Sequence, residues 1–160
     1  MKVLAVDPGY GRCGVAVMEK TPSGETLLFS GCIETAKDDD FSERLAAVVA
    51  ACGKLADEHG PDAIAIEKLY FSKNQKTAMR VAEVRGALIA MAGARDMPLF
   101  EYGPGQVKLA TTGSGGADKK QMIRMVRMLM KMNDAARHDD EYDAIAIAMA
   151  HLAISRYTSL

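Results

Sequence analysis

The 160-residue sequence predicts an α/β fold with a five-stranded mixed sheet, in which an antiparallel meander is extended by parallel strands and helices cover both faces. Three closely spaced apolar segments lie within the first 33 residues and are separated by turn residues, which is typical of a meander. From residue 42 onward, segments with helical spacing alternate with short apolar segments, which indicates parallel strands between two helical layers. We expect a single domain over residues 1–160, because one hydrophobic core commonly takes up roughly 100–200 residues.

Each predicted strand is a short apolar segment bounded by turn residues. In chain order, the strands are residues 1–6, 14–18, 27–33, 63–66 and 99–102. The segment Thr-Pro-Ser-Gly at 21–24 supplies the hairpin turn of the meander. Apolar residues three or four positions apart predict helices over residues 42–58, 75–94, 118–131 and 142–156. Glycines in residues 103–105 and 113–116 predict loops between the last strand and the next helix.

The composition is that of an ordinary globular protein, with 49% hydrophobic and 26% charged residues, and excludes a disordered or collagen-like chain. The formal net charge of -1 at first argues against nucleic-acid binding, since such proteins are more often strongly basic. The charge is, however, unevenly distributed. Residues 19–62 carry four basic and ten acidic side chains, whereas residues 68–95 carry six and one, and residues 104–137 carry seven and two. Two basic stretches therefore oppose one acidic stretch.

The three cysteines, Cys13, Cys32 and Cys52, form no C-x-x-C pair. We expect three reduced, buried thiols of a cytoplasmic protein, rather than a disulfide or a zinc site. The first acid follows a short apolar segment, which is too short for the apolar core of a secretory leader. No apolar segment approaches the ~18 residues of a membrane span, so no membrane association is expected.

Acidic residues stand at three places where ligand sites of α/β proteins gather. Asp7 follows the first apolar strand and Glu67 follows the AIAI strand, and an isolated carboxylate there is costly to desolvate. Asp140 and Asp143 share one face of the last helix, and Asp139 has equivalent spacing to Asp143. Acids in a first helical turn are also favoured by the helix dipole alone. The apolar sequence AIAIAMA that follows predicts a buried helix, which favours a cage of oxygen ligands for Mg²⁺ or Mn²⁺.

The two basic stretches flank these acids and carry the candidate DNA contacts. Aromatic rings beside cations are suited to stacking on unpaired bases and to phosphate contact. Alternatively, one ring packs into the core, and the cations of the second stretch serve only solubility. The candidate DNA-binding residues are Tyr70, Phe71, Lys73, Asn74, Lys76, Arg80, Lys108, Lys119 and Lys120.

Four sequence segments resemble the RuvC family of Holliday-junction resolvases. They are VDPGYGRCG at 6–14, AIEKLYFSKNQKTAMRVAEVRG at 65–86, FEYGPGQVKLATTGSGGADKKQM at 100–122 and DDEYDAIAIAMAH at 139–151. The resemblance covers nearly the whole chain, and the four segments in this order are highly specific. It implies a ribonuclease H-like fold and a metal-dependent endonuclease that acts as a homodimer on four-way DNA junctions.

The resemblance also implies roles for single residues and for partners. The four acidic ligands of the family map to Asp7, Glu67, Asp140 and Asp143, which implies that these residues are both the catalytic and the metal-binding residues. Tyr70 takes the place of a family aromatic at the DNA crossover, and Lys108 and Lys119 match functional lysines. The family position aligned with Asp140 is sometimes histidine, which makes His138 a competitor. A junction-branch-migration motor is the implied partner. The double aromatic Tyr70-Phe71 and the mildly acidic charge depart from the pattern.

The hypothesis from these residues is two-metal-ion hydrolysis of a junction phosphodiester. Two ions about 3.5–4 Å apart activate the attacking water and stabilise the leaving oxygen, leaving 5′-phosphate and 3′-hydroxyl ends. Two-fold symmetry in a dimer gives paired nicks in opposed strands, in DNA recombination and repair. Three alternatives stay open: a ribonuclease H-like nuclease acting on RNA, a non-catalytic DNA-junction-binding module, and an ATP-binding domain of the actin or hexokinase type, which needs two such halves.

Overall fold

The computed structural model describes residues 1–69, 75–133, 135 and 137–155. Within this part of the chain, five strands form one sheet in the order β3-β2-β1-β4-β5. The strands are β1 (Lys2–Asp7), β2 (Arg12–Thr21), β3 (Gly24–Glu34), β4 (Ala63–Glu67) and β5 (Leu99–Tyr102). The first three pair antiparallel, whereas β4 lies parallel to both β1 and β5. The predicted mixed sheet is therefore confirmed.

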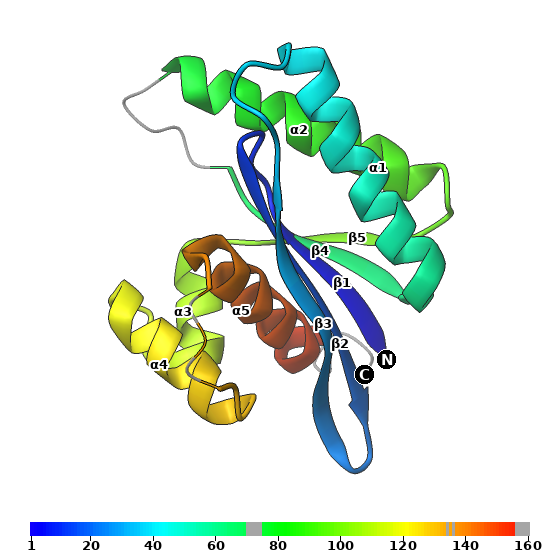
Figure 1. The fold of residues 1–160 in the computed structure, drawn as a ribbon. Helices are drawn as coiled ribbons and strands as arrows, with labels where there is room; N and C mark the ends of the chain where they lie inside the picture. The colour runs from blue at the N-terminus through cyan, green and yellow to red at the C-terminus, as the bar shows by residue number, and fades with distance from the viewer. Residues whose placement is uncertain (70–74, 134, 136, 156–160) are drawn as a thin grey trace.

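Helices cover both faces of the sheet, as expected (Figure 1). On one face lie α1 (Phe41–His59) and α2 (Gln75–Gly93), which pack against each other. On the other face lie α3 (Pro104–Thr112), α4 (Lys119–Leu129) and α5 (Asp139–Ile154), where α3 and α4 pack against α5. Along the described residues, no helix has the length and the apolar character that crossing a membrane requires.

The central strand β1 divides the interior into two cores because its side chains alternate between the faces. Val3 and Ala5 belong to the core under α5, whereas Leu4 and Val6 belong to the core under α1 and α2. All four side chains are fully buried. Helix α5 is itself buried along almost its whole length, which agrees with its continuous run of apolar residues.

The structure corrects the expected loop at residues 103–105. Gly103 caps α3 in an extended conformation, and Pro104 begins the helix, where its missing N–H leaves no hydrogen bond unmade. The Gly103 N–H donates to the Gln106 side chain at 2.9 Å, and the helix ends at Gly113, whose φ of 77° requires a glycine. Proline and glycine mark the ends of a helix here, at a place where their composition predicts a loop.

Two smaller expectations also change. Helix α5 begins at Asp139, three residues before the predicted start at residue 142, and the acids form its first turns, as expected. Cys13 and Cys52 are buried free thiols, as predicted, but Cys32 is only half-buried, near the end of β3. The hairpin turn is confirmed, with Thr21 paired with Gly24.

Candidate active site

The register of β1 and β4 places two of the candidate acids side by side. Val6 pairs with Ile66 in this parallel ladder, so Asp7 and Glu67 are the next residues on adjacent strands. Neighbouring strands lie about 4.8 Å apart, and both carboxylates leave the sheet at the same edge. Asp7 and Glu67 also line one small cavity beside Pro8 and Arg85.

The first turns of α5 bring the other acids to the same edge. Gly14 on β2 pairs with Asp7, and the backbone of Asp140 packs directly on Gly14. A Cβ at position 14 would lie 1.8 Å from the Asp140 carbonyl oxygen, so only glycine permits this approach. Asp143 is three positions further along α5 and lies on the same face as Asp140.

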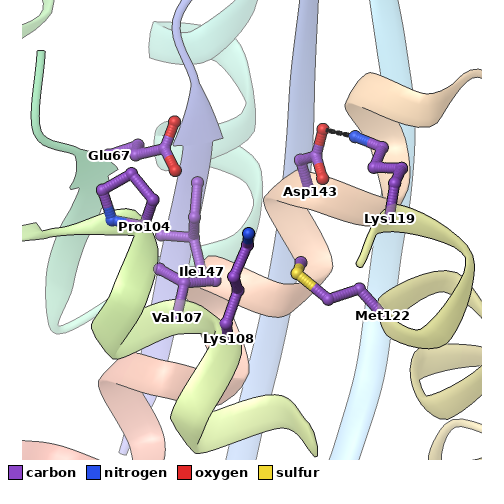
Figure 2. A pocket seen from close by; sticks show the side chains of 8 residues that line it. All are labelled: Glu67, Pro104, Val107, Lys108, Lys119, Met122, Asp143 and Ile147. Atoms are coloured by element: carbon purple, nitrogen blue, oxygen red, sulfur yellow. Dashed lines mark hydrogen bonds and ion pairs between the residues drawn. The ribbon is translucent and has the colours of Figure 1, made fainter. Parts of the chain in front are cut away.

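A cavity of about 340 Å³ opens between Glu67 and Asp143. Figure 2 shows the two carboxylates on opposite sides of this cavity, with the ammonium group of Lys108 directed toward the space between them. Lys119, at the start of α4, donates a hydrogen bond to Asp143 from the same side. The apolar side chains of Val107, Met122 and Ile147 complete the walls.

Burial and mutual repulsion change the protonation of these carboxylates. Burial, followed by the negative charges of Asp143, Glu67 and Asp140, raises the pKa of Asp7 to about 7. Lys119 opposes this effect in part. The four predicted acids therefore act on one another electrostatically, which residues spread over the surface would not do.

The pKa values of Glu67 and Asp143 are also raised. Burial is the main cause that raises the pKa of Glu67, followed by the charge of Asp143. Burial also raises the pKa of Asp143, whereas its hydrogen bond from Lys119 lowers it. Burial and the neighbouring charges thus disfavour the ionised form of both carboxylates, and a cation bound between them would offset both effects.

Two arginines at this edge were not predicted from the sequence. Arg85 of α2 donates to the Glu67 carbonyl oxygen and pairs with Glu101 of β5, which fixes the end of β4. Arg12 Nε lies 3.2 Å from Asp140 Oδ2. Because each pair joins distant parts of the chain, no local spacing indicates it.

The remaining acids at the start of α5 have other environments. Glu141 is 5% exposed and accepts hydrogen bonds from Ser30 at 2.6 Å and from Arg137 at 2.5 Å, so its carboxylate is already bound. Asp139 is exposed, whereas Asp140 is half-buried and adds to the field at Asp7. The charges of both residues raise the pKa of Asp143, and that of Asp140 also raises the pKa of Asp7.

The predicted DNA-contact residues fall into several places. Lys108 and Lys119 line the cavity. Lys120 lines a separate hollow on α4, and Lys76 is exposed at the start of α2. Arg80 is bonded to Glu83 and stacks on Phe41, with 3.9 Å between its guanidinium carbon and the ring centroid. Tyr70, Phe71, Lys73 and Asn74 lie outside the described residues.

Comparison with known proteins decides the family. Residues 3–151 match the family described as Crossover junction endodeoxyribonuclease RuvC. The chain belongs to the RuvC family. It is 41% identical to the Crossover junction endodeoxyribonuclease RuvC of Thermosipho melanesiensis over 98% of this chain and 100% of that protein, and 40% identical to that of Petrotoga mobilis over 94% and 93%.

The fold of this RuvC-family chain agrees with its solved relatives. Thermus thermophilus RuvC in complex with Holliday junction substrate superposes with a TM-score of 0.91 at 30% identity, covering 99% of this chain and 97% of that one. The mixed sheet with helices on both faces is the ribonuclease H-like fold that the sequence resemblance implied.

Membership of the RuvC family implies an endonuclease that uses a divalent metal ion. The residues present fit such an ion. Asp7, Glu67, Asp140 and Asp143 carry hard carboxylate oxygens, the kind of ligand atom that Mg²⁺ and Mn²⁺ prefer. One oxygen of Asp140, Oδ2, is buried without a hydrogen-bond partner, although Arg12 Nε lies 3.2 Å away, and burial together with the neighbouring acids raises the pKa of Asp7.

Proposed function

We propose that this chain resolves four-way (Holliday) DNA junctions by paired, symmetric nicks in recombination and repair, and leaves 5′-phosphate and 3′-hydroxyl ends. The observation that carries the proposal is the convergence of four acids at one edge of the sheet, beside a cavity lined by two lysines, in a RuvC-family chain. A similar protein has been solved with a Holliday junction substrate, which supports the choice of DNA structure.

In this proposal, Asp7, Glu67, Asp140 and Asp143 hold two divalent cations, Mg²⁺ or Mn²⁺. The cations supply a water of lowered pKa and positive charge beside the leaving oxygen. Asp7 and Glu67 are held by paired strands and Asp140 by its backbone contact with Gly14, so the ligands are positioned before the substrate arrives. Asp143 is bonded to Lys119, so a cation that binds there competes with that ammonium group.

Lys108 and Lys119 supply positive charge to the phosphate in the cavity. Charge that develops on the scissile phosphate is stabilised by donors already in position, and both ammonium groups line the cavity before DNA binds. Lys76, Arg80 and Lys120 lie outside this cavity and are proposed to contact the DNA backbone further away. The remaining proposed contacts, with Tyr70, Phe71, Lys73 and Asn74, serve base stacking and binding of the crossover.

Two cuts in opposed strands require two sites related by symmetry, so we include a homodimer in the proposal. The resemblance to the RuvC family further suggests a junction-branch-migration motor as partner and the bacterial cytoplasm as the place of action. The whole chain, residues 1–160, acts as one nuclease domain in this scheme. No additional catalytic domain is needed, since all four acids come from one sheet and the helix on it.

The test is cleavage of a synthetic fixed four-way junction with each strand end-labelled in turn, in Mg²⁺ and in Mn²⁺. We expect symmetric nicks in opposed strands whose product ends are ligated without further treatment. The Asp143→Asn variant is expected to bind the junction but to cleave it at least about 100-fold more slowly, because a neutral amide replaces a charged carboxylate ligand. Asp139→Asn is the matched control, since this neighbouring acid is exposed, and it is expected to cleave normally.

Other outcomes would identify the alternatives. Preferential cleavage of a structured RNA would favour a ribonuclease H-like nuclease for RNA. Junction binding without cleavage in either ion would favour a non-catalytic module. Normal cleavage by Asp143→Asn combined with failure of Asp139→Asn would contradict the proposed ligand set and assign the ligand role to Asp139 in place of Asp143.

A further inference from the structure

A second group of metal-binding side chains lies at the junction of β3 and α5. Cys32 is near the end of β3, His138 is the N-cap of α5 and Asp140 is in its first turn. The thiol sulfur, a ring nitrogen and a carboxylate oxygen of these residues all lie within 4.8 Å of one another. The cysteine and the histidine are far apart in the sequence, so only the fold brings them together.

Carboxylates and cationic side chains both adjoin this group, since Arg12, Lys37 and Arg44 line the same hollow as Glu34 and His138. Glu34 Oε1 lies 3.2 Å from His138 Nε2, so a second carboxylate adjoins the three ligands. Asp140 Oδ2 is buried without a hydrogen-bond partner, although Arg12 Nε lies 3.2 Å away. The Arg12 side chain is 56% exposed and can turn into solvent when a cation takes its place beside Asp140.

The kinds of ligand atom select the metal. Thiolate sulfur and imidazole nitrogen favour Zn²⁺, whereas Mg²⁺ and Mn²⁺ prefer oxygen ligands. Ligand bonds of about 2.0–2.3 Å in a tetrahedral zinc site bring ligand atoms closer together than 4.8 Å, and small side-chain rotations supply this difference. The backbone need not move, since β3 and the start of α5 are already packed in the fold.

We propose that Cys32, His138 and Asp140 bind Zn²⁺ or a similar thiol-binding divalent cation, with Glu34 adjoining, and that this binding inhibits the nuclease. The thiol binds as a thiolate and releases its proton to solvent. The Asp140 carboxylate is then held beside Cys32 and His138 and no longer binds the catalytic ions together with the acids at the sheet edge. The binding stands on geometry alone, whereas the inhibition rests on the proposed function, in which Asp140 is a ligand of the catalytic ions.

The binding is tested without nuclease activity by titrating the full chain with Co²⁺, which takes zinc sites and reports sulfur ligation. We expect a thiolate-to-cobalt charge-transfer band that disappears when one equivalent of Zn²⁺ is added. Cys32→Ser should abolish the band, and His138→Gln should weaken Co²⁺ binding at least tenfold, as loss of metal-site partners commonly does by about 10–100-fold. His59→Gln, remote on α1, is the matched control and keeps the band.

Absence of the band in the wild-type chain, or its persistence in Cys32→Ser, would overturn the site. His138 makes no side-chain cap hydrogen bond to α5, so its replacement leaves the helix start intact and provides a second variant if Cys32→Ser folds poorly.

The inhibition is tested by junction cleavage in excess Mg²⁺ with increasing Zn²⁺. We expect Zn²⁺ to lower the cleavage rate of the wild-type chain at least tenfold, and Cys32→Ser to cleave normally in Mg²⁺ and to resist Zn²⁺. Equal inhibition of both chains would overturn the inhibitory role even where the cobalt band confirms binding. Failure of the wild-type chain to cleave in Mg²⁺ alone would count against the proposed nuclease, not against the cobalt result.

Discussion

Replacing Asp7 by asparagine is expected to stabilise the metal-free protein while it abolishes cleavage. Burial and the neighbouring acids raise the pKa of Asp7 from 3.8 to about 7. The difference is about three units, and each unit corresponds to about 1.4 kcal/mol, so the charged Asp7 costs the native state about 4 kcal/mol above pH 7. Asparagine keeps the size of the side chain and removes this charge.

The stability of the wild-type chain changes with pH because the native and unfolded states bind the Asp7 proton over different pH ranges. The native state keeps the Asp7 proton up to about pH 7, whereas the unfolded state loses it near pH 4, so stability is lost as pH rises through this range. Below about pH 4 the wild-type carboxyl is neutral in both states, and the two proteins should be equally stable there. The advantage of Asp7→Asn therefore grows between about pH 4 and 7 and is constant above that range.

The assay is urea unfolding in a chelator at several pH values, with Asp38→Asn as a control that removes an exposed acid from the loop before α1. Added Mg²⁺ should stabilise the wild-type chain more than Asp7→Asn, because only the former keeps the full ligand set. A pH-independent difference between the two chains, or a destabilised Asp7→Asn at pH 8 in chelator, would refute the electrostatic account of the site.

Two further substitutions test how the site is held and charged. Gly14→Ala places a methyl group 1.8 Å from the Asp140 carbonyl oxygen and so displaces the start of α5, and a shift of about 1 Å is expected to lower the cleavage rate about 100-fold. Gly86→Ala, where nothing lies within 4 Å of the new carbon, should leave the rate unchanged, and equal rates for both variants would contradict this role of Gly14. Lys119→Ala should lower the cleavage rate at least about tenfold, whereas Lys54→Ala, which removes an exposed lysine on α1, should cleave normally. A neutral Lys119→Ala would assign that lysine to solubility.

Much of the fold was predictable because its signals are local. The apolar strand that ends at Asp7 and the AIAI strand that ends at Glu67 lie in the middle of the sheet, where both faces are buried. The apolar run behind Asp143 correctly indicated a buried helix. The convergence of the acids followed from the rule that parallel strands present their carboxyl ends at one edge.

The parts that could not be predicted depend on packing between distant segments. Helix α3 was missed because Pro104 and the glycines beside it equally suit a helix start and a loop, and only the packing against α5 decides between them. The bond from Arg85 to the end of β4, and the approach of Cys32 to His138, have no counterpart in local spacing. Gly14 gave no signal, since its role depends on a helix that begins 125 residues later.

The contact between Gly14 and Asp140 has a consequence for how the site can change over time. The contact is made by backbone atoms, so it is independent of the side chain that residue 140 carries. Another side chain at position 140 would therefore project from the same point, at the same helix start. One substitution there can change the chemical group that the helix start presents without displacing the helix. The glycine that faces it permits no such exchange, because every other residue would push the helix away.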